Sequence, residues 1–532
     1  MQRCFRRPAW FRSLRGMTEL VRLGIVDMGS NAIRMMVVEV APGRTVPAVL
    51  DSQRLPVRLG RDVFHGGKIP EPTVRAVVDA FKRFRAGCDR AGVKHIRAVA
   101  TSAMRDARNR DVVIDQVREA SGIEIEVISG TEEAYLLGLG VQSRVDLREG
   151  RSLLVDVGGG SVEVLLVEKG QVVNASSYRL GALRMLQAFS ASANNGEGFV
   201  ELMQRHLRSL EQRIVGRFGD GRIDRYVATG GNIDSLADLL ATRGAVRRSE
   251  GTDCVLLEDL RRECTDLALL SYAERMEKKG LKPDRADTIL PAGLVYQRLG
   301  VIAGVDRILV PRVGIKEGLL KELVDGHLGS FSAADHVDTV LSACRAMGHK
   351  YHFEAAHAEA VMGLARQVFD QTHELHGLDA RARVLLDAAS LLHDIGTTVN
   401  NAGHHKHSHY LIRSSEIVGL TGEEQEIVAL LARYHRKAAP SREHEDFAGL
   451  RRKERLVVER LAAILRVADA LDRQHAGVVH SVNLRVKEDV VELKPVLAEG
   501  QTSRLTLEKR AVEEKGELFL QVFGKAPKLL SP

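Results

Sequence analysis

Several features that narrow the class of a protein quickly are scarce in this sequence. Its 532 residues contain five cysteines and one tryptophan, and aromatic residues make up 4% of the chain. The cysteines lack the spacing of a metal site or a disulfide framework, which argues against a small secreted domain and predicts a reducing, cytoplasmic environment. No apolar run is long enough to span a bilayer, so we expect no membrane partner.

The remaining composition is that of an ordinary globular protein with a basic excess. Hydrophobic residues make up 44% and charged residues 28% of the chain, and the formal net charge is +7. The length is sufficient for three or four domains. A basic balance fits a polyanionic partner, and composition alone allows nucleic acid and polyphosphate equally. Residues 1–20 are rich in arginine, and we expect a disordered basic tail there, with a transit peptide or a later start at Met17 as alternatives.

One stretch organises the rest of the chain. An apolar run contains Asp156 near its end, three glycines follow at residues 158–160, and a second apolar run follows Glu163. This pattern predicts a β-hairpin whose turn has no side chains, so that backbone N–H groups can approach an anion closely. The two carboxylates would hold a divalent metal or orient a water molecule, as phosphate chemistry requires. The alternative is a tight turn in which glycine only supplies a positive φ.

The same arrangement occurs earlier in the chain. There, a strand-like run contains Asp27 and is followed by Gly29, Ser30, Asn31 and further apolar residues. A third glycine turn lies at Gly230–Asn232. Two Asp-x-Gly hairpins in successive halves predict two related lobes that face a shared phosphate-binding cleft.

Strand and helix patterns alternate through the first part of the chain and predict an α/β region of about 300 residues. Within it, apolar residues at helical spacing predict a helix over Pro72–Ala91. We expect a strand over Leu55–Gly60 and a buried strand over Ile96–Ala100, which leads toward Arg105. An arginine just beyond a strand end can bind phosphate, and the alternative is a solvated residue at a helix start.

A second polar motif follows a short predicted strand. Ser129 and Glu132 fit the Ser-x-x-Glu pattern of a capping box. That pairing gives Glu132 a structural task and leaves Glu133 as a candidate general base. The alternative for Glu133 is a helix-dipole contact in the first turn.

The composition changes near residue 326. Sixteen of the 19 histidines lie after residue 325, and clear strand patterns are absent until about residue 478. Five possible metal ligands lie in apolar helical settings, spaced so that four bundle helices can direct them to one point. They are His357, His393, Asp394, His435 and Asp469. Imidazole with carboxylate suits Mn, Fe, Zn or Mg, whereas the alternative is a set of structural core histidines.

Taken in order, the motifs resemble the exopolyphosphatase / guanosine pentaphosphatase family. The stretches that carry the resemblance are Asp27-x-Gly-Ser-Asn, Ser129-Gly-x-Glu-Glu-Ala, Asp156-x-Gly-Gly-Gly-Ser-x-Glu163, His404-His-Lys-His-Ser-His-Tyr-Leu and Arg433-Tyr-His-Arg-Lys. The resemblance implies an α/β actin-like ATPase (ribonuclease H-like) fold with lobes over residues 21–145 and 146–325. It implies an all-α HD-type domain over residues 326–475 and a small α+β domain over residues 476–532.

The resemblance also implies roles for residues of the cleft. Glu133 is similar to the family's water-activating base, and Glu163 to its partner near metal and water. Asp156, together with Asp27, resembles the carboxylates that hold Mg²⁺. The phosphate-binding positions of the family are matched by Ser30, Asn31, Arg105, Gly158, Gly159 and Ser161. The third turn departs from the family's more usual Gly-Gly-Thr at Asn232.

The resemblance implies release of the terminal phosphate from inorganic polyphosphate, and extends to the 5′ γ-phosphate of guanosine pentaphosphate. It implies a homodimer and no specific nucleic-acid partner. Two alternatives stay open: a metal-dependent phosphohydrolase whose chemistry lies in the HD-type domain, and a non-catalytic sensor of polyphosphate or guanosine alarmones. The presence of both Glu133 and Glu163 argues against a sensor, because a protein that only binds anions gains little from carboxylates beside them.

Overall fold

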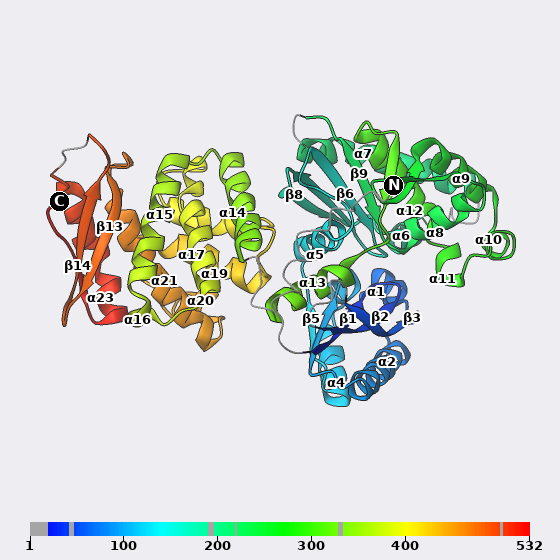
Figure 1. The fold of residues 1–532 in the computed structure, drawn as a ribbon, viewed down its shortest axis with the longest axis horizontal. Coiled ribbons are helices and arrows are strands. Elements are labelled where there is room, and N and C mark those ends of the chain that lie inside the picture. Colours follow the sequence, from blue (N-terminus) through cyan, green and yellow to red (C-terminus); the bar gives the residue numbers. More distant parts are fainter. Residues whose placement is uncertain (1–19, 42–46, 190–195, 219–220, 328–332, 501–503) are drawn as a thin grey trace. The chain divides into compact units, whose positions relative to one another are not determined.

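The computed structural model describes residues 20–41, 47–189, 196–218, 221–327, 333–500 and 504–532. The predicted basic tail therefore lies outside the described residues, apart from Leu20. The chain divides into two compact units, Met1–His336 and Val337–Pro532, whose elements are labelled in Figure 1.

The first unit contains a five-stranded sheet at its N-terminal end. Its strands are β1 (Val21–Met28), β2 (Ile33–Val40), β3 (Ala48–Leu55), β4 (His95–Ala100) and β5 (Ile125–Val127). Their order in the sheet is β3-β2-β1-β4-β5. The central strand β1 pairs antiparallel with β2 and parallel with β4. We call this sheet and its helices the first lobe.

A seven-stranded sheet follows and repeats the same core. Its strands are β6 (Arg151–Val157), β7 (Val162–Glu168), β8 (Gln171–Tyr178), β9 (Arg225–Thr229), β10 (Val246–Ser249), β11 (Thr252–Leu256) and β12 (Arg307–Val310). The order β8-β7-β6-β9-β12 matches that of the first lobe, with β11 and β10 added at one edge. The directions match as well, since β6 is antiparallel to β7 and parallel to β9. The prediction of two related lobes is confirmed, and we call this sheet and its helices the second lobe.

Helices surround both sheets. They are α1 (Leu59–Gly66), α2 (Glu71–Arg90), α3 (Ser102–Asp106), α4 (Arg110–Ser121), α5 (Gly130–Gln142), α6 (Ala182–Ala188), α7 (Gly196–Phe218), α8 (Gly231–Ala241), α9 (Leu257–Leu269), α10 (Tyr272–Lys279), α11 (Pro283–Ala286), α12 (Ile289–Ile302) and α13 (Ile315–His327). Helix α2 forms where the periodicity predicted it, and its apolar face, including Val77 and Phe81, is buried in the core of the first lobe.

The predicted strand over Leu55–Gly60 is wrong. Strand β3 ends at Leu55, and helix α1 begins at Leu59. Pro56 lacks the N–H group that a continuing strand would need, and Arg58 adopts a left-handed conformation with φ 55°. The hydrophobic residues around this point are therefore buried in a turn and in the helix that follows it, and not in a strand.

Helix α13 follows the last strand of the second lobe but packs against the first. It contacts α5 and β1, and Leu319 and Val324 share a buried cluster with Leu23 of β1. Helices α13 and α5 pack here with almost no side-chain atoms between their backbones. A Cβ atom on Gly318 would lie 1.8 Å from the carbonyl oxygen of Leu136. The two lobes are thus connected by a helix that returns from one to the other.

The second unit consists of helices followed by a three-stranded sheet. Its elements are α14 (Ala333–Lys350), α15 (Ala355–Gln371), α16 (His373–His376), α17 (Ala380–Leu392), the 3₁₀ helix η3 (Ile395–Thr398), α18 (His404–Arg413), α19 (Gly422–Tyr434), α20 (Glu445–Ala448), α21 (Arg452–Leu471), β13 (Val479–Val486), β14 (Val490–Leu497), α22 (Thr506–Lys515), α23 (Glu517–Phe523) and β15 (Ala526–Leu529). Strands begin at Val479, close to the predicted position. The sheet packs on α15 through β13 (Figure 1) and shares one hydrophobic core with the helices.

In the parts of the chain that the structure describes, no helix combines the length and apolar character that a membrane crossing needs.

The contact between α5 and α13 can be tested by adding one methyl group. We expect Gly318→Ala to lower the free energy of unfolding of the first unit by about 1–3 kcal/mol, because the new Cβ atom would overlap a backbone oxygen that cannot move independently. Thermal and urea unfolding measure this difference. Gly216→Ala in α7 is the matched control, since a Cβ atom there meets no other atom within 4 Å. Equal stability of the Gly318→Ala variant and wild type would contradict the close packing.

Candidate active site

The two hairpins that carry the Asp-x-Gly motifs have the same turn. In the first, the backbone N–H of Gly29 donates to the oxygen of Ala32 at 3.1 Å, and the turn at residues 158–161 has the equivalent bond at 3.0 Å. A Cβ atom on Gly159 would lie 3.0 Å from Cβ of Ser30. The tips of the two turns are therefore in contact, and glycine in the second turn makes this approach possible.

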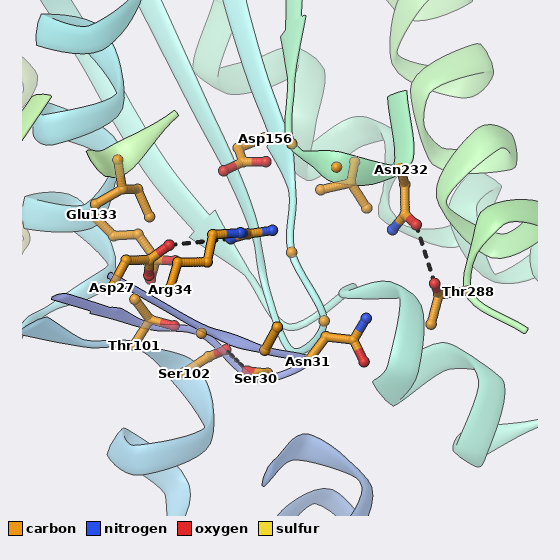
Figure 2. A pocket seen from close by; sticks show the side chains of 18 of the residues that line it. Asp27, Ser30, Asn31, Arg34, Thr101, Ser102, Glu133, Asp156, Asn232 and Thr288 are labelled. Carbon is orange, nitrogen blue, oxygen red and sulfur yellow. Dashed lines mark hydrogen bonds and ion pairs between the residues drawn. The ribbon is translucent and has the colours of Figure 1, made fainter. Parts of the chain in front are cut away.

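A cavity of about 80 Å³ lies beside these turns and has walls from both lobes (Figure 2). Strand ends, the start of α5 and the segments that begin α8 and α12 contribute to it. The lining residues are Asp27, Gly29, Ser30, Asn31, Ala32, Arg34, Thr101, Ser102, Glu133, Asp156, Val157, Gly158, Gly159, Gly230, Gly231, Asn232, Arg285, Thr288 and Ile315. All three glycine turns expected from the sequence contribute to this one cavity.

Side chains of the first turn are fixed from both lobes. The hydroxyl oxygens of Ser30 and Ser102 lie 2.8 Å apart in a buried hydrogen bond. From the second lobe, the backbone oxygen of Asp284 accepts a hydrogen bond from the Asn31 amide at 3.0 Å. These contacts hold the first turn in one conformation, as a rigid anion-binding loop requires.

The third turn approaches the others closely. Gly230 has φ 100°, and a Cβ atom on it would lie 2.3 Å from Oδ1 of Asp156. Next to it, Oδ1 of Asn232 accepts hydrogen bonds from Nη1 of Arg285 and Oγ1 of Thr288, each at 3.1 Å. Asn232, where the sequence departs from the family's more usual threonine, thus links this turn to α11 and α12.

The repeated hairpins differ in charge at one equivalent position. Asp27 is paired across the hairpin with Arg34, and Asp156 is paired across its hairpin with Glu163. Nη1 of Arg34 donates to Oδ2 of Asp27 at 3.1 Å. The first lobe therefore supplies a neutralised pair, whereas the second lobe supplies two neighbouring carboxylates.

The carboxylates of the second lobe hold their protons more tightly than usual. Burial, together with the charges of Glu133 and Asp156, raises the pKa of Glu163 well above its ordinary range. Burial and the charge of Glu133 raise the pKa of Asp156 to about 7. Ser177 donates to Oε1 of Glu163 at 2.9 Å, and Oε2 has no hydrogen-bond partner among the described residues. Burial thus disfavours the charged form of these carboxyls, and a cation bound beside them would favour it.

Glu133 enters the cavity from the first turn of α5. The Ser129 hydroxyl accepts from the backbone N–H of Glu132 at 3.1 Å, which forms half of the predicted capping box. The Glu132 carboxylate lies 3.5 Å from Arg97, away from the cavity. Glu133 is therefore the carboxylate of this turn that faces the cavity, and Nη1 of Arg105 donates to its Oε2 at 2.9 Å.

Opposing effects set the proton affinity of Glu133. Burial raises its pKa, the charge and hydrogen bond of Arg105 oppose that rise, and the charge of Asp27 adds to it. Arg105 is itself held by the backbone oxygen of Ile128 at 2.8 Å. Arg105 thus orients Glu133 and stabilises its charged form.

The structure brings most of the predicted cleft residues to the cavity wall. Those that line it are Asp27, Ser30, Asn31, Glu133, Asp156, Gly158 and Gly159. Arg105, Ser161 and Glu163 do not line it, and the roles implied for all ten residues stay predictions. Sequence reasoning missed Arg34, although aligning the two hairpins places it at the position equivalent to Glu163.

Arg285 was also missed, and no local sequence signal marks it. It reaches the cavity from α11, a segment far along the chain from both Asp-x-Gly motifs. Burial and repulsion from Arg34 and Arg54 lower the pKa of Arg285 to about 10. A guanidinium held among other cations beside an anion-binding turn is suited to a phosphate oxygen.

The histidine-rich region of the second unit forms a separate cluster. The five predicted ligands converge from α15, the C-terminal ends of α17 and α19, and α21. His357, His393 and Asp469 form one group of possible metal ligands, and Asp394 forms a second with His404 and His435. A third group adds His475, which the spacing argument did not single out.

Fold and cavity together define a class of protein. Two α/β lobes with the same strand order, each presenting an Asp-x-Gly hairpin to a shared cavity, form the actin-like ATPase fold. The model of the Ppx/GppA phosphatase family matches residues 36–327, and that of Ppx/GppA phosphatase, domain III, matches residues 341–515. The chain belongs to the Ppx/GppA phosphatase family, so the predictions of the family and of a hydrolase are confirmed.

Relatives extend this match along most of the chain. A guanosine-5'-triphosphate,3'-diphosphate pyrophosphatase of Vibrio parahaemolyticus is 26% identical over 447 residues, which cover 83% of this chain and 86% of the relative. A protein of the same name from Aliivibrio fischeri is 24% identical and covers 88% of this chain and 90% of the relative. An exopolyphosphatase structure from Cytophaga hutchinsonii, with a TM-score of 0.53 and 27% identity, covers 57% of this chain and 98% of that chain.

A glycine outside the recognised motifs tests the geometry of the second turn. A Cβ atom on Gly181 would lie 2.3–2.4 Å from backbone atoms of Gly160 and Ser161. We expect Gly181→Ala to displace this turn and to lower phosphatase kcat/KM about 100-fold, because a displacement of roughly 1 Å can cost that much. Gly66→Ala, where a Cβ atom meets nothing within 4 Å, is the control. Wild-type activity in a folded Gly181→Ala protein would show that the turn does not set the reaction geometry.

Proposed function

We propose that the protein releases the terminal phosphate of inorganic polyphosphate by attack of water in the cavity between the two lobes. The observation that carries this proposal is that one cavity is lined by glycine-containing turns, which suit phosphate, and by the carboxylates Glu133 and Asp156, which suit water and metal. The Cytophaga hutchinsonii exopolyphosphatase, which resembles the two lobes over nearly its whole length, supports the same substrate class.

In this reaction, Glu133 is the general base. The oxygen of a water molecule forms a bond to the terminal phosphorus, and Glu133 takes the proton that the water loses. The phosphoanhydride bond breaks, and the shortened chain leaves with the electron pair of that bond. Arg105 keeps Glu133 charged and oriented for this transfer. Positioning and electrostatic stabilisation contribute most of the catalysis, as is usual in phosphoryl transfer.

The donor set of the cleft fits Mg²⁺, the ion predicted from the sequence. Mg²⁺ prefers carboxylate oxygens and water, and Asp156 supplies a carboxyl group at the cavity wall, with Glu163 paired beside it across the hairpin. Asp27 contributes one oxygen, since Arg34 binds the other. When bound, the ion neutralises charge on the phosphate oxygens. Asp156, with Asp27, would hold it, and Glu163 would complete the acidic wall behind them.

The phosphate group would be bound by the turns and by basic side chains. Ser30 and Asn31 present the first turn, and Gly158 and Gly159 present the second, to the same cavity. Arg285 supplies a guanidinium to the same cavity. Backbone N–H groups of such turns form an anion-binding concavity without placing side chains in it. Ser161, at the end of the second turn, fixes its shape through the bond from Gly158.

Guanosine pentaphosphate is the second candidate substrate, and a specific observation favours it. The relatives that match more than four fifths of this chain carry the name guanosine-5'-triphosphate,3'-diphosphate pyrophosphatase. Its 5′ terminal phosphoanhydride presents the same reacting group as polyphosphate, so one site serves both. The partners we propose are these two polyanions, with no specific nucleic acid and a homodimer as the assembly.

The assignment of Glu133 is tested by a matched pair of variants. We expect Glu133→Gln to lower kcat for phosphate release from long-chain polyphosphate with Mg²⁺ by about 10²–10⁴-fold, because an amide cannot take the proton. Glu132→Gln changes the adjacent carboxylate, which contacts Arg97, and is expected to retain activity. Running guanosine pentaphosphate in parallel identifies the preferred substrate. Equal rates for Glu133→Gln and wild type on both substrates would refute the site.

The role of Arg105 is tested by the pH dependence of the reaction. The charges around Glu133 are Asp27, Asp156, Glu163 and Arg105. A general base works in its deprotonated form, so activity falls as pH drops through its pKa. Removing the cation raises that pKa, and we expect Arg105→Met to shift the acid limb of kcat/KM toward higher pH.

The matched control for this profile is Arg108→Met. Arg108 is exposed and donates to the backbone oxygen of Gly66 at 3.0 Å. We expect its removal to leave the acid limb in place. An unshifted limb in Arg105→Met, with activity lowered equally at every pH, would show that Arg105 does not act through Glu133.

A further inference from the structure

Helix α6 packs on the turn at residues 158–161, and one of its side chains also reaches the first lobe. We propose that Arg184 of α6 is a positioning residue for the phosphatase reaction, because it fixes the carbonyl group of Gly160 and holds this turn against helices α1 and α3. The inference rests on the function proposed for the cleft. It adds a residue that lies outside the motifs recognised in the sequence.

The backbone of α6 binds two carbonyl groups of the turn. The N–H group of Ala182 donates to the oxygen of Gly158 at 2.9 Å. The N–H groups of Leu183 and Arg184 donate to the oxygen of Gly159 at 2.9 and 3.1 Å. N–H groups in the first turn of a helix have no acceptor within that helix. Main-chain atoms therefore fix two of the three glycine carbonyl groups.

The third glycine carbonyl group is bound by a side chain. Nε of Arg184 donates to the oxygen of Gly160 at 2.8 Å. A peptide unit is planar and trans, so its N–H group points away from its carbonyl oxygen. Holding the carbonyl groups of residues 158–160 on the α6 side therefore directs the N–H groups of residues 159–161 away from α6. An anion-binding turn depends on such a fixed orientation, because its N–H groups form the concavity for the anion.

The guanidinium group of Arg184 also contacts two helices of the first lobe. Its Nη2 atom donates to Oδ2 of Asp106, in α3, at 2.6 Å. Its Cζ atom lies 4.1 Å from the centre of the Phe64 ring, in α1. A planar guanidinium can stack on a ring and still donate hydrogen bonds. One side chain thus joins the second turn to α1 and α3.

The turn and the first lobe are in close contact at the same point. A Cβ atom on Gly160 would lie 2.2 Å from Cζ of Phe64 and 2.5 Å from Oγ of Ser102. The Ser102 hydroxyl is the group that shares a hydrogen bond with Ser30 of the first turn. A displacement of Gly160 would therefore alter contacts of both anion-binding turns.

Asp106, the ion-pair partner of Arg184, directly follows Arg105 in α3. Burial works against the cation of Arg105, whereas the charge of Glu133 and, further, that of Asp106 raise its pKa. Arg105 in turn donates to the Glu133 carboxylate. Asp106 therefore links Arg184 to the arginine that orients the proposed base.

Burial distinguishes Arg184 from Arg179, which contacts the same carboxylate. Nη2 of Arg179 lies 2.9 Å from Oδ2 of Asp106, but 73% of its side chain is exposed, against 15% for Arg184. An exposed ion pair contributes little to stability. Arg179 is therefore a matched control, with the same residue type and the same partner.

The three contacts of Arg184 require the shape of an arginine. The guanidinium uses Nε for Gly160, Nη2 for Asp106 and its face for Phe64. A lysine side chain carries its donors on one atom and has no planar group, so it can pair with Asp106 without keeping all three contacts. Charge and shape can therefore be separated by experiment.

Steady-state kinetics of the full-length protein test the assignment. We expect Arg184→Gln to lower kcat/KM for phosphate release from long-chain polyphosphate about 10–100-fold, because a displaced turn misaligns the bound phosphate. Arg184→Lys should lose nearly as much, and Arg179→Gln should match wild type. An equal kcat/KM in Arg184→Gln and wild type, or equal losses in Arg184→Gln and Arg179→Gln, would overturn the proposal.

A variant of the partner tests the anchor in the first lobe while leaving the arginine in place. In Asp106→Asn, Arg184 keeps its bond to Gly160 but loses its ion pair. We expect kcat/KM to fall by a smaller factor than in Arg184→Gln. An unchanged kcat/KM would show that the first lobe does not hold the turn through Arg184.

Chemical rescue separates positioning from folding. Arg184→Ala leaves a space for a guanidinium beside Gly160, and we expect added guanidinium at millimolar concentration to restore part of its activity. Urea has a similar shape but no charge and should not restore it. A loss of activity that follows the loss of folded protein, measured by circular dichroism, and that guanidinium does not reverse would overturn the positioning role.

Binding separates this inference from the reaction proposed for the cleft. Isothermal titration calorimetry measures the affinity for tripolyphosphate in the Glu133→Gln background, in which hydrolysis is disabled. Adding Arg184→Gln should raise Kd at least about tenfold, whereas adding Arg179→Gln should not. Equal affinities would overturn the role of Arg184. If wild type releases no phosphate from polyphosphate or guanosine pentaphosphate, the proposed function fails, and this comparison still decides whether Arg184 shapes the anion-binding turn.

Discussion

The cleft depends on the close approach of two turns that have almost no side chains between them. Ser30 and Gly159 are nearly in contact, and a Cβ atom on Gly160 would collide with Phe64 and Ser102. Glycine at these positions is what allows the turns and their neighbours to pack this closely. Because the same hairpin occurs in both lobes, the chain brings two anion-binding turns together from two directions. The carboxylates stand on the strands beside these turns, so binding and chemistry share one framework.

The two repeated hairpins differ in the charge of one equivalent residue. In the first lobe, Arg34 neutralises Asp27 across the hairpin. In the second lobe, Glu163 occupies the equivalent position, and burial raises the pKa values of Glu163 and Asp156. Bringing like charges together in a buried place is unfavourable without a counter-ion. The core strand order of the two lobes is the same, whereas the charges at this equivalent position differ.

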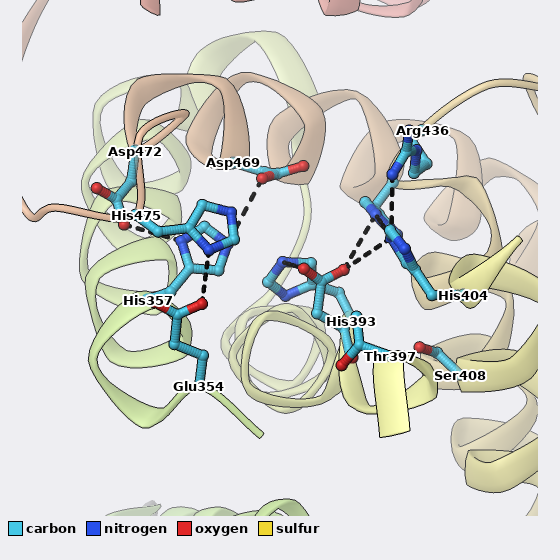
Figure 3. Close-up of polar contacts among 12 residues, drawn as sticks. Glu354, His357, His393, Thr397, His404, Ser408, Arg436, Asp469, Asp472 and His475 are labelled. Carbon is cyan, nitrogen blue, oxygen red and sulfur yellow. Dashed lines mark hydrogen bonds and ion pairs between the residues drawn. The ribbon is translucent and has the colours of Figure 1, made fainter. Parts of the chain in front are cut away.

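The second unit also brings polar side chains together in a buried place, but these are mainly imidazoles. Its imidazoles are oriented by backbone carbonyl groups and by Asp472, so each ring presents one nitrogen to a common centre. A helical bundle suits this task, because ligands at the ends of several helices converge without long loops. The described part of the chain thus contains a cavity lined by carboxylates between the α/β lobes and a cluster of imidazoles with carboxylates among helices (Figure 3).

Local patterns in the sequence determined the hairpins, helix α2 and the start of the strands near Val479, and they picked out five side chains that the fold brings into one histidine cluster. These features follow from apolar periodicity, turn chemistry and spacing, which act over a few residues. The same local rules failed at Leu55–Gly60, where a proline and a left-handed Arg58 turn the chain into a helix. Only the tertiary structure decided that Arg285 joins the cavity, that α13 returns to the first lobe and that His404 completes a second ligand group. Those outcomes depend on burial and on charges brought together from distant segments, and neither is encoded in the neighbourhood of a single residue.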